Sequence, residues 1–264
     1  MSEILQNNDR LPINPKTPSL WDEMYWVFSE KYDYKQVNQL AKDIIHIHKN
    51  RLAVPVNIEY HNDTIDDTPI LFQLMDDWKT TGKALIRLQS PWKNNTFDPL
   101  LYSHIIHHEL SHIYNDEYEH LRHNWLTNKQ IQTLETIDKE HIFNNFHIEV
   151  CIKEAVTDLA AMQMQWFSHT AVLSFLKTVI WFLDTSEALD TKLWLLRDII
   201  RFKSIILWLA ENIDFPPEVN IVLKRIQSIQ ADIQPLLHNK QKEHLLYTEN
   251  YIQELSKQFF ENTI

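Results

Sequence analysis

Glycine and cysteine are almost absent from this chain of 264 residues, which contains one of each. Phosphate-binding loops and dinucleotide-binding turns need several glycines, so the single Gly82 excludes both. The single cysteine, Cys151, cannot form an intramolecular disulfide, and residues 1–11 lack the basic and then apolar pattern of a secretory signal. These absences favour a reducing compartment, and we therefore expect a cytoplasmic protein.

Positive charge and long apolar runs are also scarce. The chain has 25 Lys and Arg residues against 36 Asp and Glu residues, and its net charge of -11 would repel a phosphate backbone. The longest apolar stretch, residues 170–183, is interrupted by Lys177 and is shorter than the roughly 20 residues that a membrane-spanning helix needs. We therefore expect neither a nucleic-acid partner nor a membrane partner.

Apolar residues make up 44% of the chain, which is typical of a globular protein with a substantial core. Alternating residues predict strands over 54–60 and 83–89, and Pro55 restricts the first of them to a strand start or a sheet edge. The predicted fold class is α+β, predominantly α, with a small mixed portion followed by helices. Apolar residues at helical spacing predict helices over 34–50, 99–119, 128–138, 146–167, 170–183, 187–211, 217–235 and 239–261.

One of the predicted helices carries the motif HELSH at 108–112, which has the pattern HExxH. Its histidines, His108 and His112, are four residues apart and project from one face of a helix. Two imidazoles at this spacing reach one zinc ion without bending the helix, and Glu109 lies beside them, where a general base is needed. The motif therefore indicates a Zn²⁺ site that still requires a third ligand.

A third ligand is expected downstream of the motif. A metzincin-type continuation needs glycine at 115 and histidine at 118, where this chain has Asn115 and Tyr118. A later helix offers Glu154 instead, and Glu149 on the same helix is the competing candidate. Asp158 favours Glu154, because a carboxylate one turn beyond the ligand could accept the second N–H of a ligand histidine and orient its ring.

HELSH and the later EAVTD, which contains Glu154 and Asp158, resemble the gluzincins, the thermolysin-like zinc metallopeptidases with HExxH followed by ExxxD. The resemblance implies that His108, His112 and Glu154 bind Zn²⁺. It also implies that Glu109 is the general base and that Asp158 orients His108. HELSH is similar as well to the motif of zinc-peptidase-like domains that act on phage repressors, so the subfamily stays open.

The resemblance also implies a domain organisation and an activity. A zincin-like metallopeptidase domain is expected over 19–168, between an N-terminal arm at 1–18 and a helical subdomain at 169–264. Within that domain, Lys83–Gln89 corresponds to an edge strand that binds an extended substrate. The implied activity is the hydrolysis of peptide bonds in a peptide or protein substrate.

Several polar residues near the motif have other interpretations. His104 lies on the same stripe as His108 and is interpreted as a packing residue or a neighbour of the ligands, whereas His107 faces elsewhere. Cys151 is interpreted as a small core residue. The acidic residues after the motif are interpreted as a solvated helix end: Asp116, Glu117 and Glu119. The donor that would stabilise an oxyanion stays open among His141, His147, His169, His238, Tyr247 and Tyr251.

A noncatalytic function is the alternative to hydrolysis. In this interpretation the zinc ion only ties two helices together, and the helical C-terminal portion binds a partner protein. Structural zinc sites are usually closed by four protein ligands, whereas His108, His112 and Glu154 provide three, which favours catalysis. The missing oxyanion donor favours the regulator or adaptor.

Overall fold

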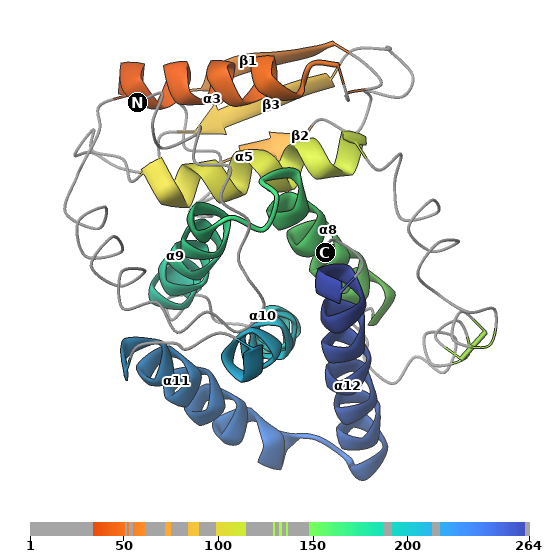
Figure 1. The fold of residues 1–264 in the computed structure, drawn as a ribbon. Coiled ribbons are helices and arrows are strands. Elements are labelled where there is room, and N and C mark those ends of the chain that lie inside the picture. The colour runs from red at the N-terminus through yellow and green to blue at the C-terminus, as the bar shows by residue number, and fades with distance from the viewer. Residues whose placement is uncertain are drawn as a thin grey trace. The chain divides into compact units, whose positions relative to one another are not determined.

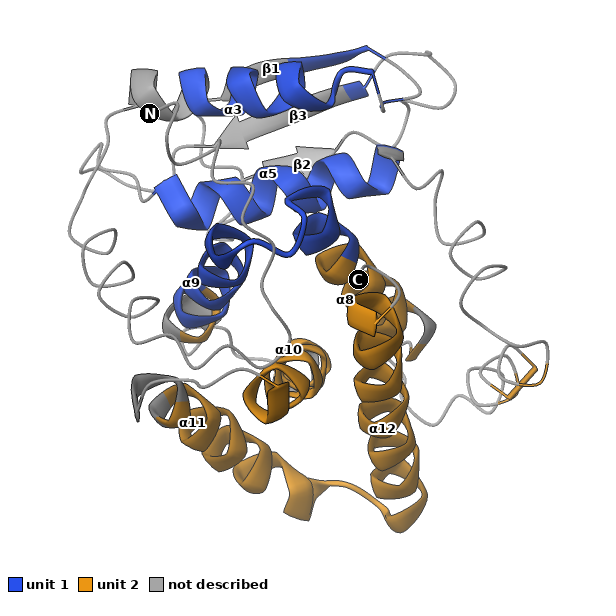
Figure 2. Cartoon of the chain, viewed as in Figure 1, with its two compact units in different colours: residues 1–10, 19–117, 160–181 blue, residues 11–18, 118–159, 182–264 orange. Residues whose placement is uncertain are grey.

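The computed structural model describes residues 34–50, 52, 55–61, 72–74, 84–89, 99–114, 129, 132–133, 136, 148–186, 192–212 and 217–261. These residues are mostly helical, which confirms the predominantly α class, and no helix among them is both long and apolar enough to cross a membrane. The chain divides into two compact units (Figure 2). Unit 1 comprises residues 1–10, 19–117 and 160–181, and unit 2 comprises residues 11–18, 118–159 and 182–264.

Unit 1 contains a three-stranded sheet in the order β1-β3-β2. β1 (Val56–His61) pairs in parallel with β3 (Ala84–Gln89), and β2 (Phe72–Leu74) pairs antiparallel with the other side of β3. The residue before β1, Pro55, has no amide donor, and its carbonyl accepts a hydrogen bond from the Ala84 N–H at 2.9 Å. β1 therefore starts after the proline at an edge of the described sheet, as the sequence predicted.

The prediction that Lys83–Gln89 is an edge strand is wrong. β3 is the central strand, because β1 covers it from Val56↔Ala84 to His61↔Gln89 and β2 covers its other side. β2 is three residues long, which is too short for alternation of apolar and polar residues to reveal a strand. Strand addition at β3 is consequently blocked where β2 is paired with it.

The core of unit 1 forms where two helices meet the sheet (Figure 1). α3 (Tyr34–His48) packs next to β1, α5 (Pro99–Tyr114) packs next to β2, and the two helices contact each other. The apolar residues that the two helices contribute to this core recur at helical spacing. They are Leu40, Ala41 and Ile44 on α3, and Leu101, Tyr102, Ile106, Leu110 and Ile113 on α5.

The boundary between the two units falls inside α8 (Ile148–Met164), so this helix belongs to both units. Its C-terminal end is attached to α5 within unit 1. The Ser111 hydroxyl donates a hydrogen bond to Met164 Sδ at 3.3 Å, and the Ser103 hydroxyl donates one to Gln165 Oε1 at 3.3 Å.

The turn after α8 is built without glycine. Trp166 and Phe167 have positive φ angles of 59° and 46°, which costs a residue with a Cβ about 1–2 kcal/mol each. The Phe167 N–H donates to the Met162 carbonyl at 3.0 Å, which is the closing hydrogen bond of a Schellman-type helix end. Ser168 then begins α9 (His169–Ser186), because its hydroxyl accepts the Ala171 N–H at 3.1 Å.

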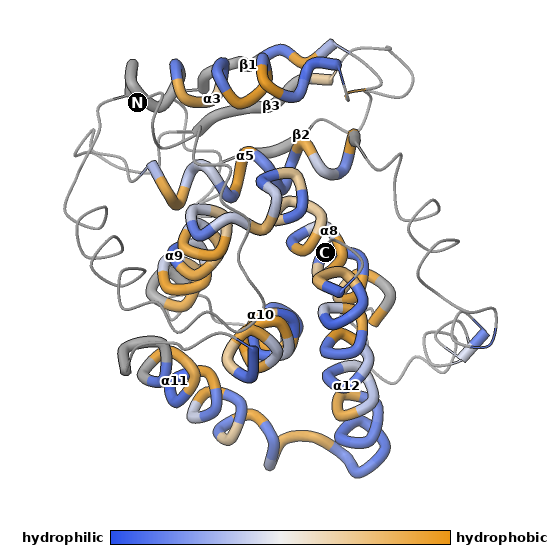
Figure 3. The backbone as a smooth tube through the Cα atoms, viewed as in Figure 1, coloured by the Kyte–Doolittle hydropathy of each residue, from blue (hydrophilic) through white to orange (hydrophobic). Residues whose placement is uncertain are grey.

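Helices make up the described part of unit 2. α10 (Lys192–Asn212) contacts both α11 (Pro217–Ile233) and α12 (Asn239–Glu261), and the 3-10 helix η1 (Gln234–Leu236) follows α11. Hydrophobic and hydrophilic residues alternate around α12 (Figure 3). Its buried residues recur every three or four positions: Leu245, Thr248, Tyr251, Ile252, Leu255, Ser256, Phe259 and Phe260.

The predicted helices agree with the described ones to within a few residues at most ends, and α12 agrees at both ends. α10 is described from Lys192 and α5 as far as Tyr114, so residues 187–191 and 115–119 of the predicted helices lie outside the described residues. The arm predicted at 1–18 lies outside the described residues, and the helix predicted at 128–138 lies mostly outside them.

A polar triad joins the three helices of unit 2. Lys203 on α10 donates to Gln230 Oε1 on α11 at 2.8 Å and to both carboxylate oxygens of Glu249 on α12 at 3.0 Å. Gln230 Nε2 also donates to Glu249 Oε1. The Lys203 and Glu249 side chains are each 15% exposed, so each is compensated mainly by the other two members of the triad.

Replacing Lys203 by methionine should lower the free energy of unfolding by about 1–3 kcal/mol, because Glu249 and Gln230 would lose their shared donor while partly buried. Urea unfolding followed by far-UV circular dichroism measures the change. The matched control is Lys242→Met on an exposed position of α12, expected to stay within about 0.5 kcal/mol of wild type. An equal loss in both variants would show that the triad adds nothing specific.

Candidate metal centre

Three histidines follow one another along one face of α5. His104, His108 and His112 are spaced by four residues, and the centroid of the His108 ring lies 6.3 Å from that of His104 and 5.0 Å from that of His112. This face is separate from the buried apolar stripe that attaches α5 to α3, because residues two positions apart point about 200° from each other on a helix. The core contacts of α5 therefore leave its histidine face available to other side chains.

The predicted ligands form one of two groups of side chains that could hold a metal ion. One possible ligand atom from each of His108, His112 and Glu154 lies within 4.8 Å of those of the other two residues. The same is true of a second group formed by His104, His108 and Asp158. His108 belongs to both groups, so the Asp158 carboxylate lies near the histidine that the sequence expected it to orient.

Two further predicted residues, Glu109 and Glu149, lie on the same two helices. Glu109 is half-buried on α5, next to His108 and off the histidine stripe. Glu149, the competing ligand, is on α8, but its side chain lies outside the described residues. Among the open oxyanion donors, His141 and His147 also lie outside them.

The donor set suits zinc. Two imidazole nitrogens and one carboxylate oxygen are ligands that Zn²⁺ takes in catalytic sites, with bond lengths of about 2.0–2.2 Å. Ligands at those lengths around a tetrahedral ion lie about 3.4 Å apart. The possible ligand atoms lie within 4.8 Å of one another, and the three side chains are only half-buried.

The sequence analysis missed an arginine beside the two carboxylates. Arg201 on α10 places its Nε 3.0 Å from Asp158 Oδ2 and its Nη1 3.7 Å from Glu154 Oε2. Its Nη1 also lies 3.3 Å from Asp198 Oδ1, and Asp198 in turn contacts the Nη2 of Arg197 at 3.3 Å. Three side chains of this network are largely shielded from solvent: Asp158 is 3% exposed, Asp198 is 5% exposed and Arg201 is 10% exposed.

The charges of this network are nearly balanced. Burial works to lower the pKa of Arg201, but Asp158, Asp198 and Glu154 outweigh it and raise the pKa above its ordinary value. The guanidinium is therefore charged at any physiological pH. Three carboxylates against two guanidinium groups leave one net negative charge in this network.

The charged residues of two predicted helices could have indicated this network. Arg197, Asp198, Arg201 and Lys203 interrupt an otherwise apolar helix, and charges on a buried helix need partners of opposite sign. Glu154 and Asp158 form a matching acidic pair, but the sequence does not show which basic helix meets them.

Cys151 behaves as the core residue that the sequence predicted. It is fully buried, and its thiol donates to the Arg197 carbonyl at 3.4 Å. Burial raises the pKa of this thiol, with the nearby Asp198 charge adding to the effect. The thiolate is the nucleophilic form, so this cysteine is chemically inert.

The fourth histidine of α5, His107, faces the core. Its Nδ1 lies 2.7 Å from the Ser103 carbonyl, and its Nε2 lies 3.2 Å from Nε2 of the buried His48 on α3. A carbonyl only accepts, so Nδ1 of His107 carries the proton, and its Nε2 accepts from the N–H of His48. The pair joins the end of α3 to the middle of α5.

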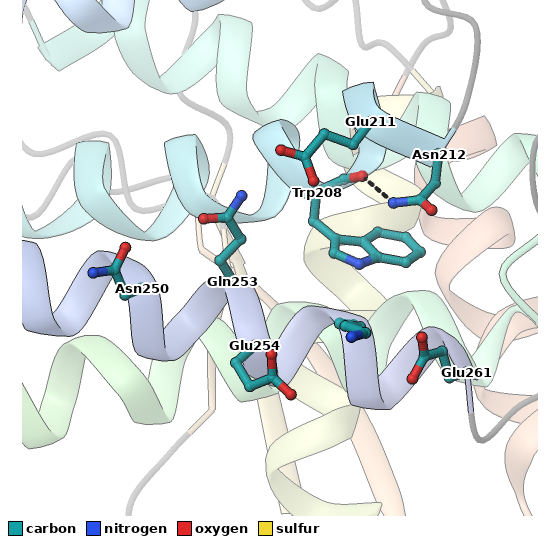
Figure 4. Close-up of a pocket in the computed structure, with 8 residues that line it drawn as sticks. Trp208, Glu211, Asn212, Asn250, Gln253, Glu254 and Glu261 are labelled. Carbon is teal, nitrogen blue, oxygen red and sulfur yellow. Dashed lines mark hydrogen bonds between the residues drawn. The ribbon is translucent and has the colours of Figure 1, made fainter.

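A polar hollow of about 340 Å³ lies in unit 2 between α10 and α12 (Figure 4). Trp208 forms part of its wall and stacks on Phe260, with ring centroids 4.1 Å apart. None of the predicted site residues lines this hollow. The other lining residues are Glu211, Asn212, Asn250, Gln253, Glu254, Lys257 and Glu261.

Comparisons with protein-family models, with curated proteins and with solved structures find no match to this chain. The function is therefore inferred from the chemistry of the residues that the fold brings together.

The His48–His107 pair generates a prediction about pH. Burial and the neighbouring His48 lower the pKa of His107 from 6.5 to about 3, so the unfolded chain binds a proton in this window and the folded chain does not. Stability is therefore lost as pH falls below about 6.5, by up to about 1.4 kcal/mol per pH unit from this residue. His107→Gln should remove that part of the slope between about pH 6 and pH 4, measured by urea unfolding.

The exposed His46, one turn from the end of the same helix α3, is the matched control. His46→Gln should keep the wild-type dependence of stability on pH. A His107→Gln slope equal to that of wild type would contradict a neutral, buried His107.

Proposed function

We propose that this protein is a zinc-dependent metallopeptidase of the gluzincin type. The grouping of His108, His112 and Glu154 on two helices is the observation that supports it most strongly, because it joins HExxH to a downstream glutamate. In this proposal, the sheet, α3, α5 and α8 belong to a zincin-like domain over 19–168. The substrate is a peptide or protein.

The residues of this site have distinct tasks in the proposal. When bound, zinc would lower the pKa of a water molecule and polarise the scissile carbonyl. Glu109 accepts a proton from the attacking water and returns it to the leaving amine. Asp158 accepts an N–H of His108, which keeps the imidazole in the orientation needed for binding.

Substrate binding differs from the expectation based on an edge strand. Because β2 is paired with β3, an extended peptide has no free side of β3 where these two strands meet. We therefore keep the proposed chemistry at α5 and α8 and drop the proposed strand addition at Lys83–Gln89.

One observation supports the noncatalytic alternative. Glu154 and Asp158 already form ion pairs with Arg201, so the two carboxylates connect α8 to α10. In a zinc-stabilised regulatory or adaptor protein, this connection and the metal would serve stability alone, and the chain would bind a protein partner without cleaving it. Both functions include metal binding, so zinc content does not distinguish them. A substitution of Glu109 does, because only hydrolysis needs a general base.

The purified protein should contain about one zinc ion per chain, measured by elemental analysis. His108→Ala, His112→Ala and Glu154→Ala should each lose the metal, because a site with three protein ligands rarely survives the loss of one. His46→Ala, which removes an exposed histidine from α3, is the matched control and should keep it.

Two outcomes of the same experiment, extended by His104→Ala, test the choice of ligands. Retention of zinc by Glu154→Ala would exclude this residue and promote Glu149. Loss of zinc from His104→Ala together with retention by His112→Ala would instead favour the group of His104, His108 and Asp158.

Glu109→Gln should abolish peptide cleavage while zinc content and melting temperature stay near wild type. Glu109 is not a proposed ligand, and a general base contributes about 10²- to 10⁴-fold in rate. The measurement is the digestion of a proteome-derived peptide library by wild type, by the variant and by wild type with a chelator.

Cleavage by wild type that disappears in the other two samples is the expected result. Cleavage that persists in Glu109→Gln would refute the hydrolytic mechanism. A library left intact by zinc-loaded wild type would favour the regulatory function.

A further inference from the structure

Arg201 contacts both acidic residues of the candidate site through different nitrogens. Its Nε faces Asp158 at 3.0 Å and its Nη1 faces Glu154 at 3.7 Å, so the planar guanidinium spans two carboxylates that are one helical turn apart. Each contact uses one oxygen of its carboxylate, Oδ2 of Asp158 and Oε2 of Glu154.

Burial makes the contacts between Arg201 and the two carboxylates costly to break. The side chain of Arg201 is 10% exposed and that of Asp158 is 3% exposed, so a rotation that broke their contact would leave both charges poorly solvated. Glu154, with 22% exposure, is the more exposed of the two carboxylates and has the longer contact. Arg201 therefore restricts Asp158 firmly and limits the rotation of Glu154.

Asp198 fixes the guanidinium itself. It contacts Arg201 Nη1 at 3.3 Å from one turn earlier on α10, and it also contacts Arg197. The positive charge of Arg201 is thus compensated within α8 and α10, which reduces its repulsion of a nearby cation. What remains is mainly a geometric restraint on the two carboxylates.

We infer that Arg201 is a positioning residue of the metal centre, which holds Glu154 and Asp158 in the orientation that zinc binding at His108 and His112 requires. This inference rests on the proposed function, because it assumes that the two carboxylates serve a metal. It adds a residue from α10 that neither HExxH nor ExxxD contains.

The test compares the zinc affinity of Arg201→Met, Arg201→Lys and wild type by competition with a chromophoric chelator. Arg201→Met should weaken zinc binding about 10- to 100-fold, as is usual for a residue that orients metal ligands. Arg201→Lys keeps the charge but presents one compact ammonium in place of a planar fork, so it should lose affinity by a smaller factor. Folding of each variant is checked by circular dichroism.

A second measurement separates positioning from general stabilisation. In protein loaded with Co²⁺ instead of zinc, both Arg201 variants should change the visible absorption bands, because these bands report the geometry of the ligands. Lys203→Met is the matched control, since it removes a partly buried cation from the same helix α10 that pairs with Gln230 and Glu249. It should lower stability and leave zinc affinity and the cobalt spectrum unchanged.

Wild-type affinity and spectrum in Arg201→Lys would overturn the inference, and this variant decides the matter if Arg201→Met does not fold. Tighter zinc binding in either variant would also overturn it, because Arg201 would then compete with the metal. Absence of zinc and cobalt binding in wild type would instead refute the proposed function, and the positioning role with it.

Discussion

The candidate site depends on one constraint: α8 is buried around most of its circumference and still carries the carboxylates of Glu154 and Asp158. α8 buries Cys151, Ile152, Ala155 and Leu159 completely, and Asp158 lies among them with 2% of its surface exposed. A carboxylate in such surroundings needs a partner of opposite charge, and Arg201 on α10 is that partner. The register between α8 and α10 is consequently determined by charge as well as by packing.

α5 also combines packing in a core with polar side chains, which in this helix are histidines. Its apolar stripe packs in the core of unit 1, one histidine turns inward to His48, and three others share a separate face. Since the inward His107 is neutral and hydrogen-bonded on both nitrogens, it adds no charge to the core. The two kinds of histidine on α5 thus differ in environment: His107 belongs to the core, whereas His108 and His112 are only half-buried.

The charges around the candidate site explain why a divalent cation is the ligand we propose. The network of α8 and α10 has one more carboxylate than guanidinium groups, and imidazoles add no negative charge. A Zn²⁺ ion would find two nitrogen donors and one carboxylate, with a position left for water. The same balance makes the site unsuitable for an anion, in agreement with the net charge of -11 of the whole chain.

Local patterns in the sequence predicted the features that depend on residues a few positions apart. The helical period placed α12 at its observed bounds, and the four-residue spacing put His108 and His112 on one face of α5. Pro55 correctly restricted β1 to a sheet edge, because a missing amide donor is a local property.

The tertiary structure decided the features that depend on distant partners. β3 became a central strand because a three-residue strand, too short to show a period, pairs with it. His107 found His48, which is 59 positions away, and Arg201 rather than another cation came to lie beside Glu154 and Asp158. Charge and periodicity in the sequence show that a buried charged group needs a partner of opposite charge. Many side chains along the chain have the right charge. Only the packing of whole helices selects which of them becomes the partner.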